Sequence, residues 1–60
     1  MKVNDLLAIM SLDSRVFFES EKDDWFTDVY RLKEVPAKYL DMAIKSVYPL
    51  LRTICITIAE

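Results

Sequence analysis

The stretch LLRTICITIAE, residues 50–60, decides how we expect this chain to fold. Its central six residues alternate strictly between isoleucine and a smaller or more polar side chain: Thr53, Ile54, Cys55, Ile56, Thr57 and Ile58. Strict alternation over this length predicts a half-buried β-strand. We expect the isoleucine face to close the core of the monomer. The opposite face, with the free backbone edge of the strand, would then be available to a second copy of the chain.

The length and composition of the chain favour self-association. Sixty residues allow one domain, residues 1–60, and a domain of this size buries only about 60% of the surface that unfolding exposes. The one cysteine, Cys55, has no partner for an internal disulfide, and without histidine it cannot complete a four-ligand zinc site. Hydrophobic residues nevertheless make up 53% of the sequence. We therefore predict a homodimer with its interface at Phe17, Thr53, Cys55 and Thr57.

The first half of the sequence predicts a helix followed by a β-hairpin. Apolar residues spaced by three and four after Val3 predict a short helix, with Asn4 or Asp5 as its N-cap and its end between residues 11 and 14. Residues 15–20 alternate as a strand, the polar run EKDD at residues 21–24 suits a hairpin loop, and a second strand is expected over residues 25–32. Alternation in the second strand assigns one face to Phe26, Tyr30 and Leu32, and the other to Trp25, Thr27, Val29 and Arg31.

The second half begins with another predicted helix. Pro36 suits the first position of a helix that runs to about residue 42. Three side chains of this helix are expected to turn inward, namely Ala37, Tyr39 and Leu40.

A strand pattern returns at residues 43–48, with Ile44 and Tyr48 on one side. Pro49 has no N–H for a β-ladder, so it either bends one long final strand or splits it in two. The predicted fold class is α+β, a small single-layer antiparallel sheet with two short helices. The element order is α-β-β-α-β, or α-β-β-α-β-β if the last strand is split at Pro49.

Charge is distributed unevenly along the chain. Residues 1–28 contain seven acidic and three basic residues, a net charge of −4, whereas residues 29–60 contain three acidic and five basic residues, a net charge of +2. The total charge is −2, and the basic residues of the second half are spread singly instead of clustered. Both features argue against nucleic-acid binding, which draws on many Lys and Arg contacts to phosphate. The apolar runs are too short to span a bilayer, and the opening residues do not read as a signal peptide. We expect a cytoplasmic protein with no membrane partner, which also suits a lone thiol.

The composition removes most catalytic chemistry. There is no glycine for a phosphate-cradling loop, and no histidine to serve as a general base. Five carboxylates fall between residues 19 and 28, but a catalytic pair or a magnesium site needs a concave, partly dry pocket, for which so small a domain has little depth. Cys55 lies between two isoleucines, where a cysteine behaves as a small inert hydrophobic residue. We therefore expect no enzymatic activity, no cofactor and no metal.

The best candidate for a functional surface is the predicted hairpin loop with the start of the strand that follows. Aromatic side chains at such a tip belong either to the core or to a protein interface, where they are the usual anchors. An acidic rim around an exposed anchor favours a basic surface on the partner. The residues that we assign to partner binding are Glu21, Asp23, Asp24, Trp25, Phe26 and Asp28.

Most of the chain resembles short accessory proteins that bacteriophages of Gram-positive bacteria encode. The resemblance rests on the opening MKVNDLL (residues 1–7), the hairpin, the segments EVPAKYLD (34–41) and SVY (46–48), and the alternating aliphatic residues at the end. The chain departs from the usual pattern in having EKDD instead of a Gly or Asn turn in the hairpin, and PLL (49–51) before the last strand. Some phage proteins of this size, the Hachiman anti-defence protein among them, inhibit bacterial immune systems by binding a defence enzyme.

Two functional hypotheses follow from the residues and the resemblance together. The first is a non-enzymatic, homodimeric phage protein that binds and inhibits a host defence protein in the host cytoplasm. The second is a structural or assembly subunit whose apolar faces serve homo-oligomerisation. Light scattering separates them, since a dimer favours the first and a large assembly favours the second.

Overall fold

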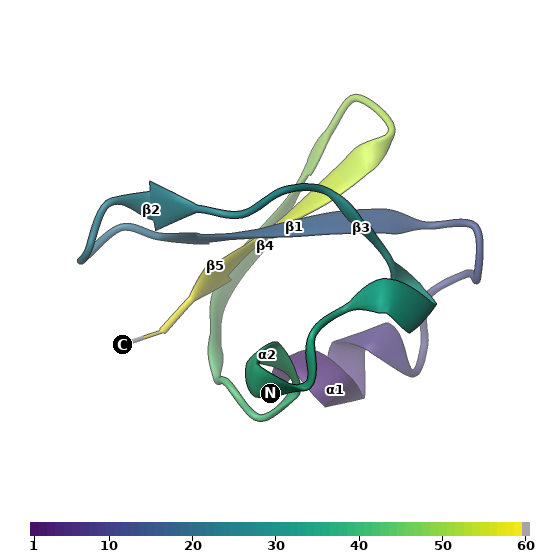
Figure 1. Ribbon diagram of the computed structural model, residues 1–60, viewed down its shortest axis with the longest axis horizontal. Helices are drawn as coiled ribbons and strands as arrows, with labels where there is room; N and C mark the ends of the chain where they lie inside the picture. The colour runs from purple at the N-terminus through teal and green to yellow at the C-terminus, as the bar shows by residue number, and fades with distance from the viewer. Residues whose placement is uncertain (60) are drawn as a thin grey trace.

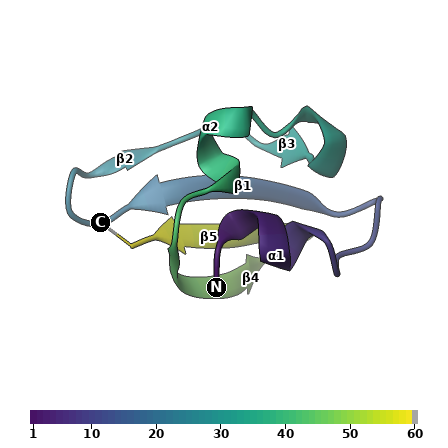
Figure 2. The same cartoon turned by 90° about the horizontal axis from the view of Figure 1, so that it is seen from below.

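In the computed structural model, which describes residues 1–59, the chain folds into one mixed β-sheet with two short helices on one of its faces (Figures 1 and 2). The helices are α1 (Val3–Leu7) and α2 (Ala37–Leu40), and a 3-10 turn, η1 (Leu32–Glu34), precedes α2. The strands are β1 (Arg15–Ser20), β2 (Trp25–Phe26), β3 (Tyr30–Arg31), β4 (Ile44–Leu50) and β5 (Thr53–Ile58). The predicted α+β class with two short helices is confirmed.

The sheet has the strand order β2-β1-β5-β4, and β3 also pairs with β1. The pairs β1–β2, β1–β3 and β4–β5 are antiparallel, but β1 and β5 run parallel. The expectation of an antiparallel sheet was therefore wrong for the central pair. Parallel neighbours need a long crossover connection, and residues 21–52, which include α2, supply it.

The core lies between the sheet and the two helices. The register pairs Val16 with Ile54 and Phe18 with Ile56, so the apolar sides of the two central strands share one face. Val16, Phe18 and Ile56 are fully buried, and the ring of Tyr39 from α2 stacks on Phe18 at 4.6 Å between centroids. The predicted core role of the isoleucine face is confirmed for its three members, Ile54, Ile56 and Ile58.

Both helices are shorter than the sequence suggested. The N-cap of α1 is Lys2, not Asn4 or Asp5, and the backbone N–H of Lys2 donates to the Asp5 carboxylate at 3.1 Å. Asp5 therefore stabilises the helix from its third position, where a carboxylate can reach back to the cap. Pro36 is the N-cap of α2. Ala37 is exposed instead of turned inward, so Tyr39 is the buried residue of α2.

The second strand of the predicted hairpin is interrupted. Thr27 ends β2 because its hydroxyl replaces a backbone carbonyl: Thr27 Oγ1 accepts the N–H of Phe18 at 3.0 Å and donates to the carbonyl of Asp28 at 2.9 Å. The backbone N–H of Thr27 still donates to the carbonyl of Phe18 at 2.9 Å, residues 28 and 29 lie outside the strands, and pairing resumes at Tyr30. Because the break shifts the alternation, Trp25 shares the helix face with Tyr30, and Phe26 lies on the opposite face. The predicted pairing of Phe26 with Tyr30 on one face was wrong.

Pro49 neither splits nor ends the strand that contains it. Pro49 pairs in register with Ile54 inside β4, and β4 is an edge strand, where a missing N–H is tolerated. The chain turns two residues later, at Leu51, whose positive φ of 59° reverses the backbone. A register shift between Ile44 and Ser46 turns Ile44 to the helix face and Tyr48 to the other, so the prediction that these two share a face was also wrong.

Candidate protein-binding face

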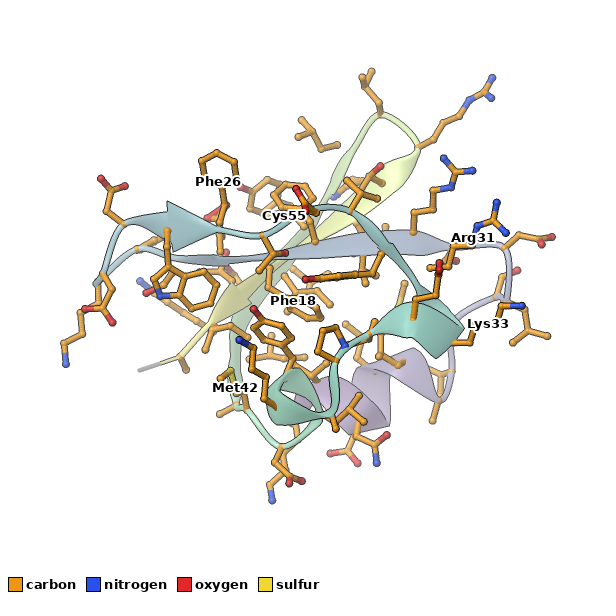
Figure 3. All side chains as sticks on the ribbon, in the orientation of Figure 1. Phe18, Phe26, Arg31, Lys33, Met42 and Cys55 are labelled. Carbon is orange, nitrogen blue, oxygen red and sulfur yellow. The ribbon has the colours of Figure 1, made fainter. Side chains whose placement is uncertain are left out.

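One face of the sheet carries no helix, and alternate residues of the strands form it; we call it the open face. In Figure 3, Phe26 and Phe18 lie on opposite sides of the sheet, with Phe18 on the helix side. The register gives the open face three residues from each of β1, β4 and β5 and one from each of β2 and β3. They are Arg15, Phe17, Glu19, Phe26, Arg31, Ser46, Tyr48, Leu50, Thr53, Cys55 and Thr57.

Three large apolar side chains of the open face are exposed. Phe26 is 80% exposed, Leu50 51% and Tyr48 41%, and Phe17 is half-buried beside them. Tyr48 and Leu50 are neighbours on the open side of β4, with Phe17 two strands away, and Phe26 lies on the opposite edge of the sheet. The open face therefore combines aromatic and apolar side chains with polar ones, which is the composition of a protein interface.

Glu19 organises the centre of the open face. Its carboxylate accepts hydrogen bonds from Tyr48 Oη at 2.8 Å, from Cys55 Sγ at 3.0 Å and from Thr57 Oγ1 at 3.3 Å. The donors come from the two strands β4 and β5, and the acceptor from β1. These bonds tie three neighbouring strands together on the side that the helices do not cover.

The Glu19 network shifts the protonation of its members. Hydrogen bonds, first from Cys55 and then from Tyr48, hold the pKa of the Glu19 carboxyl below its usual value. Burial raises the pKa of the Cys55 thiol to about 11, and hydrogen bonding with Cys55 and Glu19 raises the pKa of Tyr48 well above its ordinary value. At neutral pH the carboxyl is ionised while the thiol and the phenol keep their protons, which is the state that the three hydrogen bonds require.

The four predicted dimer residues all lie on the open face, but two of them are not accessible. Phe17 and Thr53 are half-buried, whereas Cys55 and Thr57 are fully buried under their neighbours. A second copy could touch the first two directly and the other two only through the side chains above them. Replacing Cys55 by arginine would therefore force a charged side chain into a filled space.

The predicted partner-binding residues separate onto two sides of the sheet. Glu21, Asp23, Asp24, Phe26 and Asp28 are exposed. Trp25 is half-buried on the helix side, where its ring lies 6.3 Å from that of Tyr39. Trp25 therefore packs against the core on the helix side, because the register places it opposite the buried Ser20, and it does not share a face with Phe26.

The open face has basic residues that the sequence analysis did not single out. Arg15 and Arg31 are register partners on β1 and β3. They line a shallow hollow of about 450 Å³ together with Leu12, Asp13 and Lys33. Alternation alone places Arg15 on this face, but Arg31 could be placed only once the break at Thr27 was known.

Two further kinds of site find no support in the described part of the chain. Across residues 1–59, no three His, Cys, Asp or Glu side chains gather in a way that could hold a metal ion. Over the same residues, no helix is long and apolar enough to cross a membrane. The open face is thus the main candidate for function.

The fold and the open face define a small α+β protein in which helices cover one face of the sheet. Comparison of the chain with protein-family models, curated proteins and solved structures gives no match.

Proposed function

We propose that this chain is a small, non-enzymatic binding protein of bacteriophage type that inhibits a bacterial defence protein by covering part of its surface. The resemblance of the sequence to phage accessory proteins suggests the setting, which is the cytoplasm of the host. The open face supplies the contact. The observation that carries the proposal is the exposure of Phe26, a large aromatic side chain left 80% accessible beside an acidic turn.

Phe26 has the position of an interface anchor. An aromatic ring gains much from burial against a partner, and such residues dominate the free energy of binding in protein interfaces. Three exposed carboxylates precede β2 in the chain, those of Glu21, Asp23 and Asp24, and the exposed carboxylate of Asp28 follows it. This arrangement fits a partner with an apolar recess and a basic rim, because complementary charge steers association and rejects acidic surfaces.

The absence of catalysis in this proposal rests on the state of the available groups. The Cys55 thiol is buried and protonated at neutral pH, so it is a poor nucleophile. The carboxylates of the turn at residues 21–24 are exposed to solvent, whereas a catalytic pair of carboxylates needs a concave, partly dry pocket. These side chains are therefore better suited to the recognition of another protein than to catalysis.

The proposal is tested by removing the anchor. Phe26→Asp should abolish the ability of the expressed protein to restore phage plating on bacteria that carry the susceptible defence system. Ile9→Asp is the matched control, since Ile9 is 75% exposed but follows α1 on the helix side. Circular dichroism on both variants checks that they fold.

We expect the Phe26 variant to lose plating rescue and the Ile9 variant to keep it, with a pull-down of the defence protein following the same pattern. If wild-type protein changes plating on none of a panel of defence-carrying strains and retains no host protein, the proposal is wrong.

A second candidate, a structural or assembly subunit, is favoured by the same exposed face. In that case the open face would be consumed by other copies of the chain in a large assembly. Size-exclusion chromatography with light scattering distinguishes the two, because an assembly of many copies has a molar mass far above a small multiple of 7.0 kDa.

A further inference from the structure

The two ends of the open face carry opposite charge. At one end Arg15 on β1 is the register partner of Arg31 on β3 on one side and of Thr53 on β5 on the other. Arg52 precedes Thr53 in the turn between β4 and β5, so three arginines gather at this end of the sheet. We call Arg15, Arg31 and Arg52 the arginine end. Figure 3 shows Arg31 and Lys33 at the opposite end of the molecule from the turn between β1 and β2.

Within residues 1–59 the arginine end forms no ion pair, although the carboxylates of Asp13 and Glu34 line the hollows beside Arg15 and Arg31. Like charges directly opposite each other on a sheet destabilise it. Within the described residues, the guanidinium groups of Arg15 and Arg31 make no ion pair or hydrogen bond, and the ion pair between Lys45 and Glu21, at 2.6 Å, lies at the other end. Paired guanidinium groups beside a shallow hollow suit a carboxylate ligand, which they can bind through two parallel hydrogen bonds.

The other end of β1 is acidic. The strand runs through Glu19 on the open face to Ser20 and continues into residues 21–24, the acidic turn, whose carboxylates are those of Glu21, Asp23 and Asp24. Since β1 has six residues and a strand rises about 3.3 Å per residue, the acidic turn and the arginine end are separated by about 20 Å.

We infer that the arginine end binds the acidic turn of a second copy of this chain, in a face-to-face dimer whose β1 strands run antiparallel. A two-fold axis that lies between the two open faces and crosses the strands sets each arginine end against the acidic turn of the other copy. The same contact then forms twice, as an isologous interface requires. A two-fold axis along the strands would stack arginine on arginine, so the charges select the first arrangement.

The middle of the open face suits the same dimer. Two sheets that pack face to face lie about 10 Å apart with interdigitated side chains. Phe17 and Tyr48, both register partners of Cys55, supply apolar contacts between the charged ends, and Leu50 and Phe26 extend them into the rows of Arg15 and Glu19. Glu19 enters this contact with its carboxylate already hydrogen-bonded to three donors. A buried carboxylate whose hydrogen bonds are made within the monomer needs no partner from the second copy.

This inference rests on the proposed function only in taking the open face as a surface that binds protein. The dimer is then the unbound form, and the defence protein competes with the second copy for the open face. Failure of one claim leaves the other standing, because self-association and phage plating are measured separately.

The test exchanges the charges of the two ends. One variant carries Arg15→Glu and Arg31→Glu, and a second carries Glu21→Lys and Asp24→Lys, which leaves in place Asp23, whose N–H is bonded to Ser20. A control variant carries Lys2→Glu and Lys38→Glu, two exposed cations of the helix side. Sedimentation velocity over a concentration series gives the dimer dissociation constant of each variant, and of an equimolar mixture of the first two.

We expect wild type and control to form dimers of twice 7.0 kDa. Each charge-reversed variant alone should weaken the dimer by at least about tenfold, because both of its charged contacts become repulsive. The mixture should dimerise again as a heterodimer, since every end then meets an opposite charge. In wild type, raising the salt concentration should weaken the dimer, because exposed ion pairs are screened.

Three results overturn the inference. The first is a monomeric wild type at about 100 μM, a concentration at which even a weak standard interface associates. The second is a mixture of folded charge-reversed variants that stays monomeric. The third, which does not depend on any variant folding, is a wild-type dimer whose dissociation constant is independent of salt.

Discussion

At the scale of single residues, Glu19 is the side chain whose role the structure changes most. The sequence presents it as one of five nearby carboxylates. The parallel register brings Cys55 and Thr57 alongside it, and β4 adds Tyr48, so it accepts hydrogen bonds from three side chains on two other strands. Sequence alternation could place Glu19 on the same face as Phe17, but it could not identify two donors on β5, which lie 36 and 38 residues further along the chain.

Glu19 should make the stability of the protein depend on pH in the acid range. Its pKa is lowered in the folded state, so its contribution is present above the unfolded value near 4.5 and is lost as pH falls through the lower folded value. Urea unfolding from pH 7 to pH 3 should show this loss in wild type. Glu19→Gln should be less stable at pH 7, by about 1–2 kcal/mol for weakened charged hydrogen bonds, and its stability should change less below pH 4.5. Parallel curves for the two proteins would contradict this.

Cys55 should react with thiol reagents only when the protein opens. The thiol is buried and its pKa is about 11, so at pH 8 roughly one molecule in a thousand carries the thiolate. Labelling by a disulfide reagent should be at least about a hundredfold slower in native buffer than in 6 M guanidinium, and the native rate should rise with added urea. Fast labelling of the folded protein would show that Cys55 is accessible.

At the scale of elements, the strands that alternate without interruption were predictable and the irregular ones were not. Residues 15–20 and 53–58 were expected as strands and form β1 and β5. The break after Phe26 depends on one hydroxyl that substitutes for a backbone carbonyl, and the bulge near Ser46 depends on pairing with β5. Neither has a pattern in the local sequence, and each reverses the face of the residues that follow. For that reason Phe26, Tyr48 and Arg31 could not be assembled into one surface beforehand.

Thr27 should be needed for the junction between β2 and β3. Thr27→Val keeps the shape but removes the acceptor for the Phe18 N–H, and an amide left unpaired in this position costs about 1–3 kcal/mol. Thr53→Val is the matched control, because Thr53 is also half-buried in a strand and its hydroxyl makes no hydrogen bond among residues 1–59. Chemical unfolding should show a lower free energy of unfolding for Thr27→Val and little change for Thr53→Val. Equal losses in the two variants would show that the Thr27 hydroxyl is not needed for this junction.

At the scale of the whole molecule, the two helices cover one face of the sheet and leave the open face exposed. The helices bury Val16, Phe18 and Ile56 completely, while Phe26 on the other side stays 80% exposed. Composition indicated this imbalance, since 53% hydrophobic residues exceed what so small a core can hold. It could not say which face was covered, because that depends on where the two helices pack.

A protein that buries its open face against a second copy should gain stability with concentration. For a dimer that unfolds to monomers, a hundredfold rise in concentration adds about 1.4 kcal/mol per chain, which for a domain of this size raises Tm by roughly 5–10 °C. Thermal unfolding followed by circular dichroism from about 5 to 500 μM measures the shift. The variant with Arg15→Glu and Arg31→Glu should show a smaller shift in Tm. If the Tm of wild type does not depend on concentration, its unfolding involves no dissociation of a dimer.

The parallel pairing of β1 with β5 also sets a delay during synthesis. Phe17 must wait for its register partner Cys55, which is 38 residues further along the chain. At about 5–20 residues per second, a translating ribosome needs about two to eight seconds to cover that distance. During this time β1 has an unpaired edge and an uncovered apolar side, the state in which nascent chains aggregate or recruit chaperones. A cell that makes much of this protein should therefore depend on its holdases more than the modest length of the chain suggests.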